Sequence, residues 1–203
     1  RKSSALVSMI WANNETGVVS PMNEIVALAH EAGALVHADA VQMAGKLPVD
    51  VKDVPVDYLS LSGHKMHAPM GCGALFVSRR VPFRPLLIGG GQESGHRSGT
   101  ENVASIVAFG AAAELASLSG IQTMKELRDE FELRLMNGWP GAVIHGAAAP
   151  RLPNTTSICL PGVDAAGMLI LLDQAGIACS AGSACHTGAL HASHVLEAMG
   201  ASA

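Results

Sequence analysis

Aromatic residues are scarce in this sequence. They make up 3% of its 203 residues, whereas 49% of the residues are hydrophobic, so small aliphatic side chains must fill the core. A core of this kind is common where helices pack closely on a sheet, which favours an α/β protein. Lysine and arginine are also few, 13 in all and scattered, and the formal net charge is −4. This charge balance disfavours nucleic acid as a partner.

Long hydrophobic runs and cysteine pairs are missing as well. The nearest run, SIVAFGAAAELASL, contains Glu114 and is shorter than the ~18 apolar residues of a membrane-spanning helix, so we expect no membrane partner. The four cysteines are too few for a disulfide framework in a chain of this length and form no C-x-x-C pair: Cys72, Cys159, Cys179 and Cys185. A reducing cytoplasm is therefore the expected location.

Short apolar segments alternate with a helical pattern in the first part of the chain. Strands are predicted at residues 5–12, 34–38, 57–62 and 73–78. The first two strands enclose a helix, and this unit has the length of a right-handed crossover, so the two strands should be parallel neighbours. We expect Ser20 to be the helix N-cap and Gly33 to end the helix. The buried face of this helix should consist of Ile25, Leu28, Ala29 and Ala32.

The pattern changes after the glycine-rich stretch 88–102, which is not expected to form regular structure. Helices are predicted next at about 103–118 and 121–137, the second with alternating charges typical of a solvated face. The remaining predicted elements are strands near 142–145, at 156–160 and near 177–180, and a helix at about 164–175. We place a domain boundary between the two parts, so that residues 1–125 and 126–203 belong to different domains.

Polar side chains follow the predicted strands where each strand ends. In chain order they are Asn13, Asn14, Glu15, Asp39, Gln42, Ser62, His64 and Lys65. In open α/β sheets, ligands bind outside the carboxyl ends of parallel strands. An amine, a carboxylate and hydroxyl groups at one edge suit pyridoxal 5'-phosphate, because a lysine can bond to its aldehyde and a carboxylate can hold its ring nitrogen protonated. Taken singly, however, an aspartate at a strand end such as Asp39 is more often a helix cap or turn residue, and a lone lysine such as Lys65 is usually solvated.

Several longer motifs carry a more specific signal. In chain order they are NNETGVV, HADAVQ, SGHK, GGGQESGHRSGTEN and CSAGSACHTG. Their order and spacing resemble the cysteine desulfurases of the NifS/IscS type, members of the class V aminotransferase superfamily. The resemblance covers almost the whole chain. It implies the α/β fold type I of pyridoxal-phosphate enzymes, with a mostly parallel sheet flanked by helices in a large cofactor-binding domain and part of a smaller α+β C-terminal domain.

The resemblance also implies roles for residues around the cofactor ring. Lys65 matches the lysine that bonds to the cofactor aldehyde, and Asp39 matches the partner of the pyridine nitrogen. Gln42 would contact the ring hydroxyl oxygen, and Asn14 would lie beside the ring near the substrate. His37 stands two residues before Asp39, and we expect it to pack or to form hydrogen bonds near the site.

Further implied roles concern the phosphate and the sulfur. Ser62 and His64 resemble phosphate ligands, and Thr100 resembles a threonine that reaches the phosphate of the neighbouring subunit, which implies a homodimer. Cys185 matches the catalytic cysteine that carries the substrate sulfur as a persulfide. The other three cysteines lie in or beside predicted strands, and we expect them to be core thiols. No set of histidines has a spacing that favours a metal site.

The implied reaction converts L-cysteine to L-alanine and passes the sulfur to an acceptor protein, such as an iron–sulfur scaffold. Two alternatives remain open: another class V aminotransferase or lyase, and a catalytically incomplete fragment retained for partner binding. The chain begins with Arg1 and family members are longer, so we expect it to be a fragment. The missing flanks would carry the ring-stacking residue and the arginine for the substrate carboxylate, a role in which nothing in the sequence places Arg151.

Overall fold

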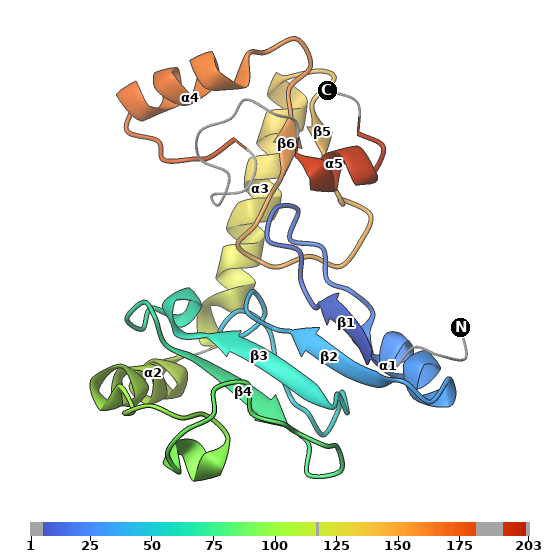
Figure 1. Cartoon of the computed structure of the whole chain (residues 1–203). Helices are drawn as coiled ribbons and strands as arrows, with labels where there is room; N and C mark the ends of the chain where they lie inside the picture. Colours follow the sequence, from blue (N-terminus) through green and yellow to red (C-terminus); the bar gives the residue numbers. More distant parts are fainter. Residues whose placement is uncertain (1–5, 117, 182–192, 202–203) are drawn as a thin grey trace.

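A four-stranded sheet forms the lower part of the molecule in Figure 1. The structure is a computed structural model, and it describes residues 6–116, 118–181 and 193–201. The strands lie side by side in chain order: β1 (Leu6–Ile10), β2 (Leu35–Asp39), β3 (Tyr58–Ser62) and β4 (Gly73–Val77). β1, β2 and β3 are parallel, whereas β4 is antiparallel to β3. The four predicted strands and the parallel pairing of the first two are confirmed.

The two faces of the sheet differ because side chains alternate along each strand. Val36 and Ala38 of β2 and Leu59 of β3 point into the hydrophobic core and are almost completely buried. His37 and Asp39 of β2 alternate with them and are only partly buried. The sheet therefore has an apolar face and a polar face, and the candidate carboxylate lies on the polar face.

Helix α1 (Met22–Glu31) covers the apolar face, but its sequence-based description needs correction. Pro21, not Ser20, occupies the N-cap position, and the Ser20 hydroxyl instead donates to the Ile10 carbonyl at 2.9 Å. The buried residues are Met22, Val26 and Ala29. Of the predicted face, only Ala29 is fully buried and Leu28 is 67% exposed, because the helix is rotated so that Met22, its first residue, packs into the core.

The end of α1 agrees with the prediction. Gly33 follows the C-cap residue Ala32 and has a φ of +74°, a left-handed conformation that glycine adopts without strain. Its amide donates to the His30 carbonyl at 3.0 Å, and the amide of Ala34 donates to the Ala29 carbonyl at 2.9 Å. The chain therefore turns back directly from α1 into β2.

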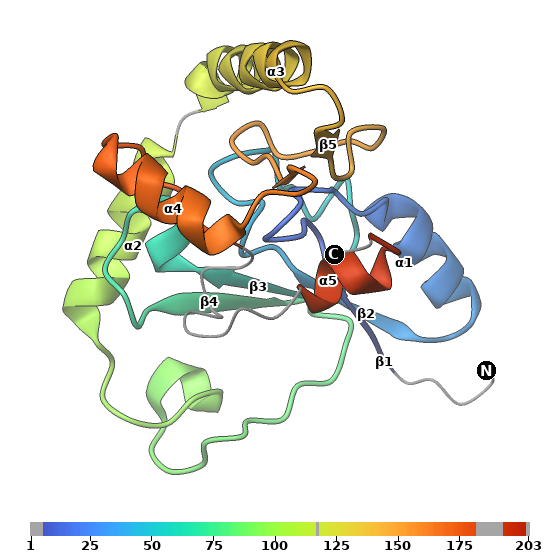
Figure 2. The same ribbon diagram turned by 90° about the horizontal axis from the view of Figure 1, so that it is seen from above.

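The remaining helices flank the sheet and lead into the second part of the chain. Figures 1 and 2 place α1 near β1 and β2 and α2 (Val103–Leu115) near β4, at the opposite side of the sheet. The long helix α3 (Ile121–Gly138) then rises away from the sheet. These positions confirm a mostly parallel sheet flanked by helices, and also the two predicted helices. Within the described residues, no helix combines the length and the apolar character needed to cross a bilayer.

The second part of the chain is smaller and mixed. It contains the antiparallel strands β5 (Val143–Ile144) and β6 (Ile158–Cys159) and the helices α4 (Ala165–Gln174) and α5 (His194–Ala198). Asp164 caps α4, because its carboxylate accepts from the Gly167 amide at 2.8 Å. The strand predicted near 177–180 is wrong: this segment forms no strand, and Ile177 is 52% exposed.

The loop after β1 joins the two parts of the chain. The amide of Val19 donates to the Pro150 carbonyl and the amide of Leu152 donates to the Gly17 carbonyl, both at 2.8 Å. Gly17 has a φ of +73°, and a Cβ at this position would lie 2.9 Å from Cβ of Thr155. The glycine of the NNETG motif is therefore required by a close approach between the loop and the second part of the chain.

Candidate active site

The candidate residues gather at the carboxyl edge of the parallel strands. In Figure 1 the arrowheads of β1, β2 and β3 point to the same edge of the sheet. Asp39 is the last residue of β2 and Ser62 is the last residue of β3. Asp39 is in register with Ile10 of β1 and with Ser60 of β3. The loops that carry Asn14, Gln42 and Lys65 therefore all leave the sheet from one edge, as predicted.

Lys65 lies in a tight turn directly after β3. The segment Gly63–Met66 forms a 3-10 helix, and His67, with a φ of +66°, ends it. A Cβ on Gly63 would lie 3.1 Å from the Cys72 carbonyl oxygen and 3.3 Å from the Phe109 ring, so a larger residue would crowd the turn against α2. The Lys65 side chain is half-buried. The glycine of SGHK therefore lets the strand turn abruptly and places an amine within one turn of the sheet edge.

Asp39 uses one of its two carboxylate oxygens to stabilise the turn after β2. Its Oδ1 accepts a hydrogen bond from the Val41 amide at 3.0 Å. Within the part of the chain that the structure describes, its second oxygen, Oδ2, accepts no hydrogen bond. The turn interpretation and the cofactor interpretation of this residue are thus compatible, because each uses a different oxygen.

Gln42 contacts a lysine that sequence reasoning missed. The Lys46 ammonium donates to Oε1 of Gln42 at 2.9 Å and to the Gln42 carbonyl at 3.1 Å. The pKa of Lys46 is lowered, first by burial of its ammonium and then by the like charge of Lys65. The turn with Gln42 and the turn with Lys65 lie close together, because a Cβ on Gly45 would lie 3.2 Å from Cγ of Met66. The spacing of four residues between Gln42 and Lys46 was the available signal in the sequence.

Two hydrogen-bonded groups of hydroxyls and imidazoles accompany these residues. Ser62 Oγ lies 2.8 Å from Nδ1 of His64, so both predicted phosphate ligands are adjacent. On the polar face of the sheet, His37 lies 2.7 Å from Ser8 Oγ and 2.9 Å from Ser60 Oγ, through its two ring nitrogens. The expectation that His37 forms hydrogen bonds near the site is confirmed. Ser8 and Ser60 were not singled out, although strand alternation places them on the face of Asp39.

Asn14 and Thr100 are both exposed. The loop that carries Asn14 is held by its neighbour Asn13, whose Oδ1 accepts from the amides of Glu15 and Thr16, both at 2.9 Å. Asn14 itself is exposed. Thr100 is exposed in the segment before α2, and no hydrogen bond among the described residues joins it to the other candidates. Its predicted role at a neighbouring subunit stays a prediction.

The predicted cysteine roles are tested only in part. Cys185, together with His186 and His191, lies outside the described residues. Cys72 and Cys159 are partly buried, in line with a packing role. Cys179 is exposed, so the expectation that it is a core thiol is wrong, because the segment around it forms no strand and is not covered.

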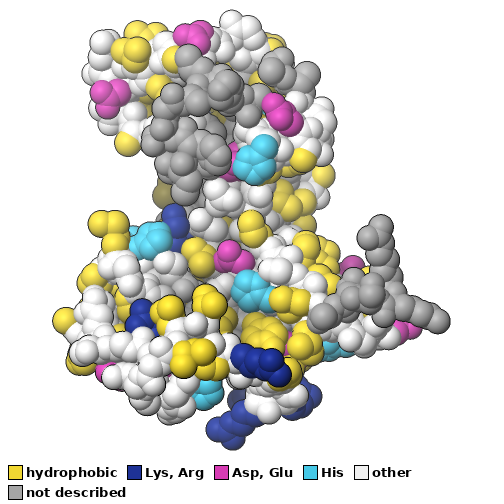
Figure 3. All heavy atoms as spheres, in the orientation of Figure 1, with side chains coloured by type: hydrophobic (Ala, Val, Ile, Leu, Met, Phe, Trp, Pro, Cys, Tyr) yellow, Lys and Arg dark blue, Asp and Glu magenta, His cyan; other side chains and the backbone are white. Residues whose placement is uncertain are grey.

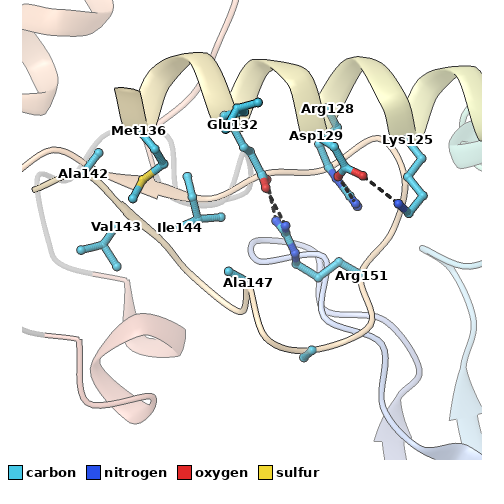
Figure 4. Close-up of a pocket in the computed structure, with 12 residues that line it drawn as sticks. Lys125, Arg128, Asp129, Glu132, Met136, Ala142, Val143, Ile144, Ala147 and Arg151 are labelled. Carbon is cyan, nitrogen blue, oxygen red and sulfur yellow. Dashed lines mark hydrogen bonds and ion pairs between the residues drawn. The ribbon is translucent and has the colours of Figure 1, made fainter. Parts of the chain in front are cut away.

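Away from the sheet edge, a cavity of about 670 Å³ lies against α3 and is lined in part by Arg151 (Figure 4). Arg151 donates two hydrogen bonds to the Glu132 carboxylate, each at 2.7 Å. Burial opposes ionisation of Glu132, but its hydrogen bonds, above all from Arg151, outweigh that effect and its pKa is lowered. The pKa of Arg151 is raised by the same hydrogen bond. The Arg151 side chain is thus buried in an ion pair with Glu132, which disfavours a role in binding a substrate carboxylate.

The donor set at the sheet edge fits pyridoxal 5'-phosphate. Lys65 supplies a primary amine, Asp39 a carboxylate oxygen, Gln42 an amide, and Ser62 with His64 a hydroxyl and an imidazole. Among the described residues, no three histidine, cysteine, aspartate or glutamate side chains are grouped as a metal ion requires. The geometry thus favours an organic cofactor that bears an aldehyde, a ring nitrogen and a phosphate.

Comparisons with known proteins show the family of this chain. The family model described as aminotransferase class-V matches residues 1–202. A cysteine desulfurase from Klebsiella pneumoniae is 50% identical over 197 residues, which cover 96% of this chain and 50% of that protein. Cysteine desulfurase 2 from Trichormus variabilis is 50% identical over 199 residues, with 97% and 50% covered. The chain spans about half the length of the curated relatives it matches.

A solved structure shows the same fold. The X-ray structure of a NifS-like protein from Rickettsia africae superposes with a TM-score of 0.86 at 38% sequence identity. The superposition covers 99% of this chain and 54% of that protein. The likeness therefore extends from the sheet edge with Lys65 and Asp39 through the second part of the chain.

Proposed function

Because this chain belongs to the class-V aminotransferase family, we propose that it acts as a pyridoxal-phosphate-dependent cysteine desulfurase. The observation that carries the proposal is the convergence of Lys65, Asp39 and Gln42 at one sheet edge. Burial and the nearby charge of Lys65 lower the pKa of Lys46, which donates a hydrogen bond to Gln42. Relatives named cysteine desulfurase, about half identical to this chain, give the substrate class.

The cofactor, when bound, supplies an aldehyde for the amine and a ring that accepts the electrons of the substrate's broken bonds. Lys65 Nζ would bond to the aldehyde and would then move protons at the substrate carbons. Asp39 would keep a proton on the pyridine nitrogen through the oxygen that does not accept from the Val41 amide. Gln42 would contact the ring oxygen, and Asn14 would lie beside the ring.

The phosphate and the second subunit complete the proposed site. Ser62 and His64 form an adjacent hydroxyl and imidazole pair that suits an anion. Thr100 reaches the phosphate of a neighbouring subunit in a homodimer. Residues 1–125 form part of the cofactor-binding domain and residues 126–203 form part of the smaller domain that carries the cysteine. We further propose the cytoplasm as the location.

Cys185 takes the sulfur in this proposal. Its thiolate attacks the sulfur of L-cysteine, so that an S–S bond forms while the carbon–sulfur bond breaks, and the carbon receives a proton to give L-alanine. The persulfide sulfur then passes to an acceptor protein, such as an iron–sulfur scaffold. Another aminotransferase or lyase of this family would have no such need for a thiol.

Replacement of Cys185 tests this function. Cys185→Ala should bind the cofactor normally but release at most about one hundredth of the alanine formed from L-cysteine, because no nucleophile takes the sulfur. Cys179→Ala is the matched control, since it removes an exposed thiol from the same motif and should keep turnover. Mass spectrometry should find one added sulfur on the Cys185 peptide. Full turnover of Cys185→Ala would move the assignment to an aminotransferase or lyase.

A further inference from the structure

Two hydrogen bonds from Lys46 define the orientation of the Gln42 side chain. Its ammonium group has hydrogen-bond donors and no acceptor. It donates to the side-chain oxygen of Gln42 at 2.9 Å and to the backbone oxygen of the same residue at 3.1 Å. Oε1 must therefore face Lys46, because the amide NH₂ group and the ammonium group are both donors and cannot form a hydrogen bond with each other.

This orientation leaves the other half of the amide available. Among the described residues, Nε2 of Gln42 makes no hydrogen bond. A free glutamine can present either its oxygen or its NH₂ group to a ligand, because the two ends have nearly the same shape. With Oε1 held by Lys46, Gln42 can offer only an N–H donor, which suits an oxygen that carries negative charge.

The turn that carries this pair is anchored at the sheet edge. Ala40 and Met43 are buried in the core, with exposures of 0% and 3%. The amides of Ala44 and Lys46 donate to the carbonyls of Ala40 and Met43 at 3.1 and 3.0 Å, so the backbone is fixed on both sides of Gln42. The neighbouring turn holds Lys65, and a Cβ on Gly45, next to Lys46, would lie 3.2 Å from Cγ of Met66, next to Lys65. The pair is thus fixed in place beside the candidate amine.

We propose that Lys46 is a positioning residue that orients Gln42 as a hydrogen-bond donor to the ring oxygen of pyridoxal 5'-phosphate. The proposal rests on the proposed function, because it needs the cofactor at this edge, but it assigns a role to a residue that the motifs did not. Lys46 acts through Gln42 and does not itself touch the cofactor.

The test is a double-mutant cycle on cofactor binding. Pyridoxal 5'-phosphate is titrated into the cofactor-free protein, and its dissociation constant is read from the change in absorption. Lys46→Met and Gln42→Ala should each weaken binding about 3- to 10-fold, the range of a single hydrogen bond. Lys46→Met should add nothing in a Gln42→Ala background, since the residue has no other route to the ligand. Lys46→Arg should restore most of the affinity, because a guanidinium also donates to Oε1.

Controls separate this role from general effects. Lys52→Met removes an exposed positive charge a short distance along the chain and should leave the dissociation constant unchanged. Circular dichroism should show that Lys46→Met is folded. Normal binding in Lys46→Met, or losses that simply add in the double variant, would overturn the proposal while leaving the proposed function intact. A wild-type protein that binds no pyridoxal 5'-phosphate would overturn both.

Discussion

Asp39 combines two interactions that a single substitution can separate. Oδ1 accepts from the Val41 amide and thereby holds the turn after β2. The negative charge of the carboxylate is what the proposed pyridine contact requires. Asparagine retains an oxygen for the Val41 amide but carries no charge, whereas alanine removes both.

We therefore expect Asp39→Asn to remain folded and to bind the cofactor, yet to lose turnover by about 100- to 1,000-fold. This corresponds to ~2.7 to 4 kcal/mol, the value of one preorganised electrostatic group. Asp39→Ala should lose the same turnover and in addition lower the midpoint of thermal unfolding, because the turn loses its acceptor. Turnover of Asp39→Asn and its cofactor affinity should be measured together. Equal losses in both quantities, or no loss, would contradict the assigned role.

The sequence predicted the chemistry of single residues better than their contacts. Lys65, Asp39 and Ser62 lie at the strand ends where the motifs placed them, because strand ends are set by hydrophobic patterns that are easy to read. The Lys46 contact with Gln42 was missed, because it depends on how an irregular turn folds. The exposure of Cys179 was missed for a similar reason, since no strand forms around it.

At the scale of elements, the turn Gly63–Met66 depends on tight packing against its surroundings. A Cβ on Gly63 would lie 3.1 Å from the Cys72 carbonyl oxygen, which is itself held by the Gly63 amide at 2.9 Å. The carbonyl cannot move away without loss of that hydrogen bond. The Phe109 ring of α2 closes the other side, with a ring carbon 3.3 Å from the same position.

Two glycine substitutions should accordingly have opposite effects. Gly63→Ala should lower the free energy of unfolding by ~1 to 3 kcal/mol, the usual cost of overpacking. Gly110→Ala, inside α2 with open space around the added methyl group, should raise it by ~0.5 to 1 kcal/mol, because alanine favours a helix over glycine. Denaturant unfolding of both variants gives the comparison. A stabilising Gly63→Ala would show that the turn is looser than the structure indicates.

The elements also show where sequence patterns mislead. The prediction for α1 had the correct position and C-terminal glycine, but its buried face was rotated, and Leu28 is exposed while Met22 is buried. The stretch Ile25–Ala29 is entirely apolar and so allows several buried faces. Which face is buried depends on the core that the helix packs against. The segment 177–180 likewise has an apolar start but finds no neighbouring strand among the described residues.

At the scale of the whole molecule, the loop after β1 links the cofactor edge to the second part of the chain. Its backbone pairs with residues 150–152, and the Ser193 hydroxyl donates to the Glu15 carboxylate next to Asn14. Ser193 follows Cys185 by eight residues. This contact could not be predicted from the sequence, because its partners are 178 residues apart. It places Ser193, the N-cap residue of α5, beside the loop that should flank the cofactor ring.

Part of the molecular surface is apolar, which composition did not reveal. Figure 3 shows hydrophobic side chains over the lower part of the molecule, where Figure 1 places the sheet and α2. Helix α2 is largely apolar, with Ser105 and Glu114 as its polar side chains, and it leaves Val103, Val107 and Leu115 more than 60% exposed. Composition gives the amount of apolar surface, but only the arrangement of elements decides which part of it is buried.

The proposed chemistry depends most directly on which lysine bonds to the cofactor, and one measurement decides this. The protein is incubated with pyridoxal 5'-phosphate, reduced with sodium borohydride, digested and analysed by mass spectrometry. The pKa of Lys46 is lowered by burial and then by the nearby charge of Lys65, so Lys46 is the natural competitor. We predict a phosphopyridoxyl group on the Lys65 peptide, an absorption band that borohydride bleaches, and the loss of both in Lys65→Ala. A label on Lys46, or an unchanged band in Lys65→Ala, would contradict the central claim.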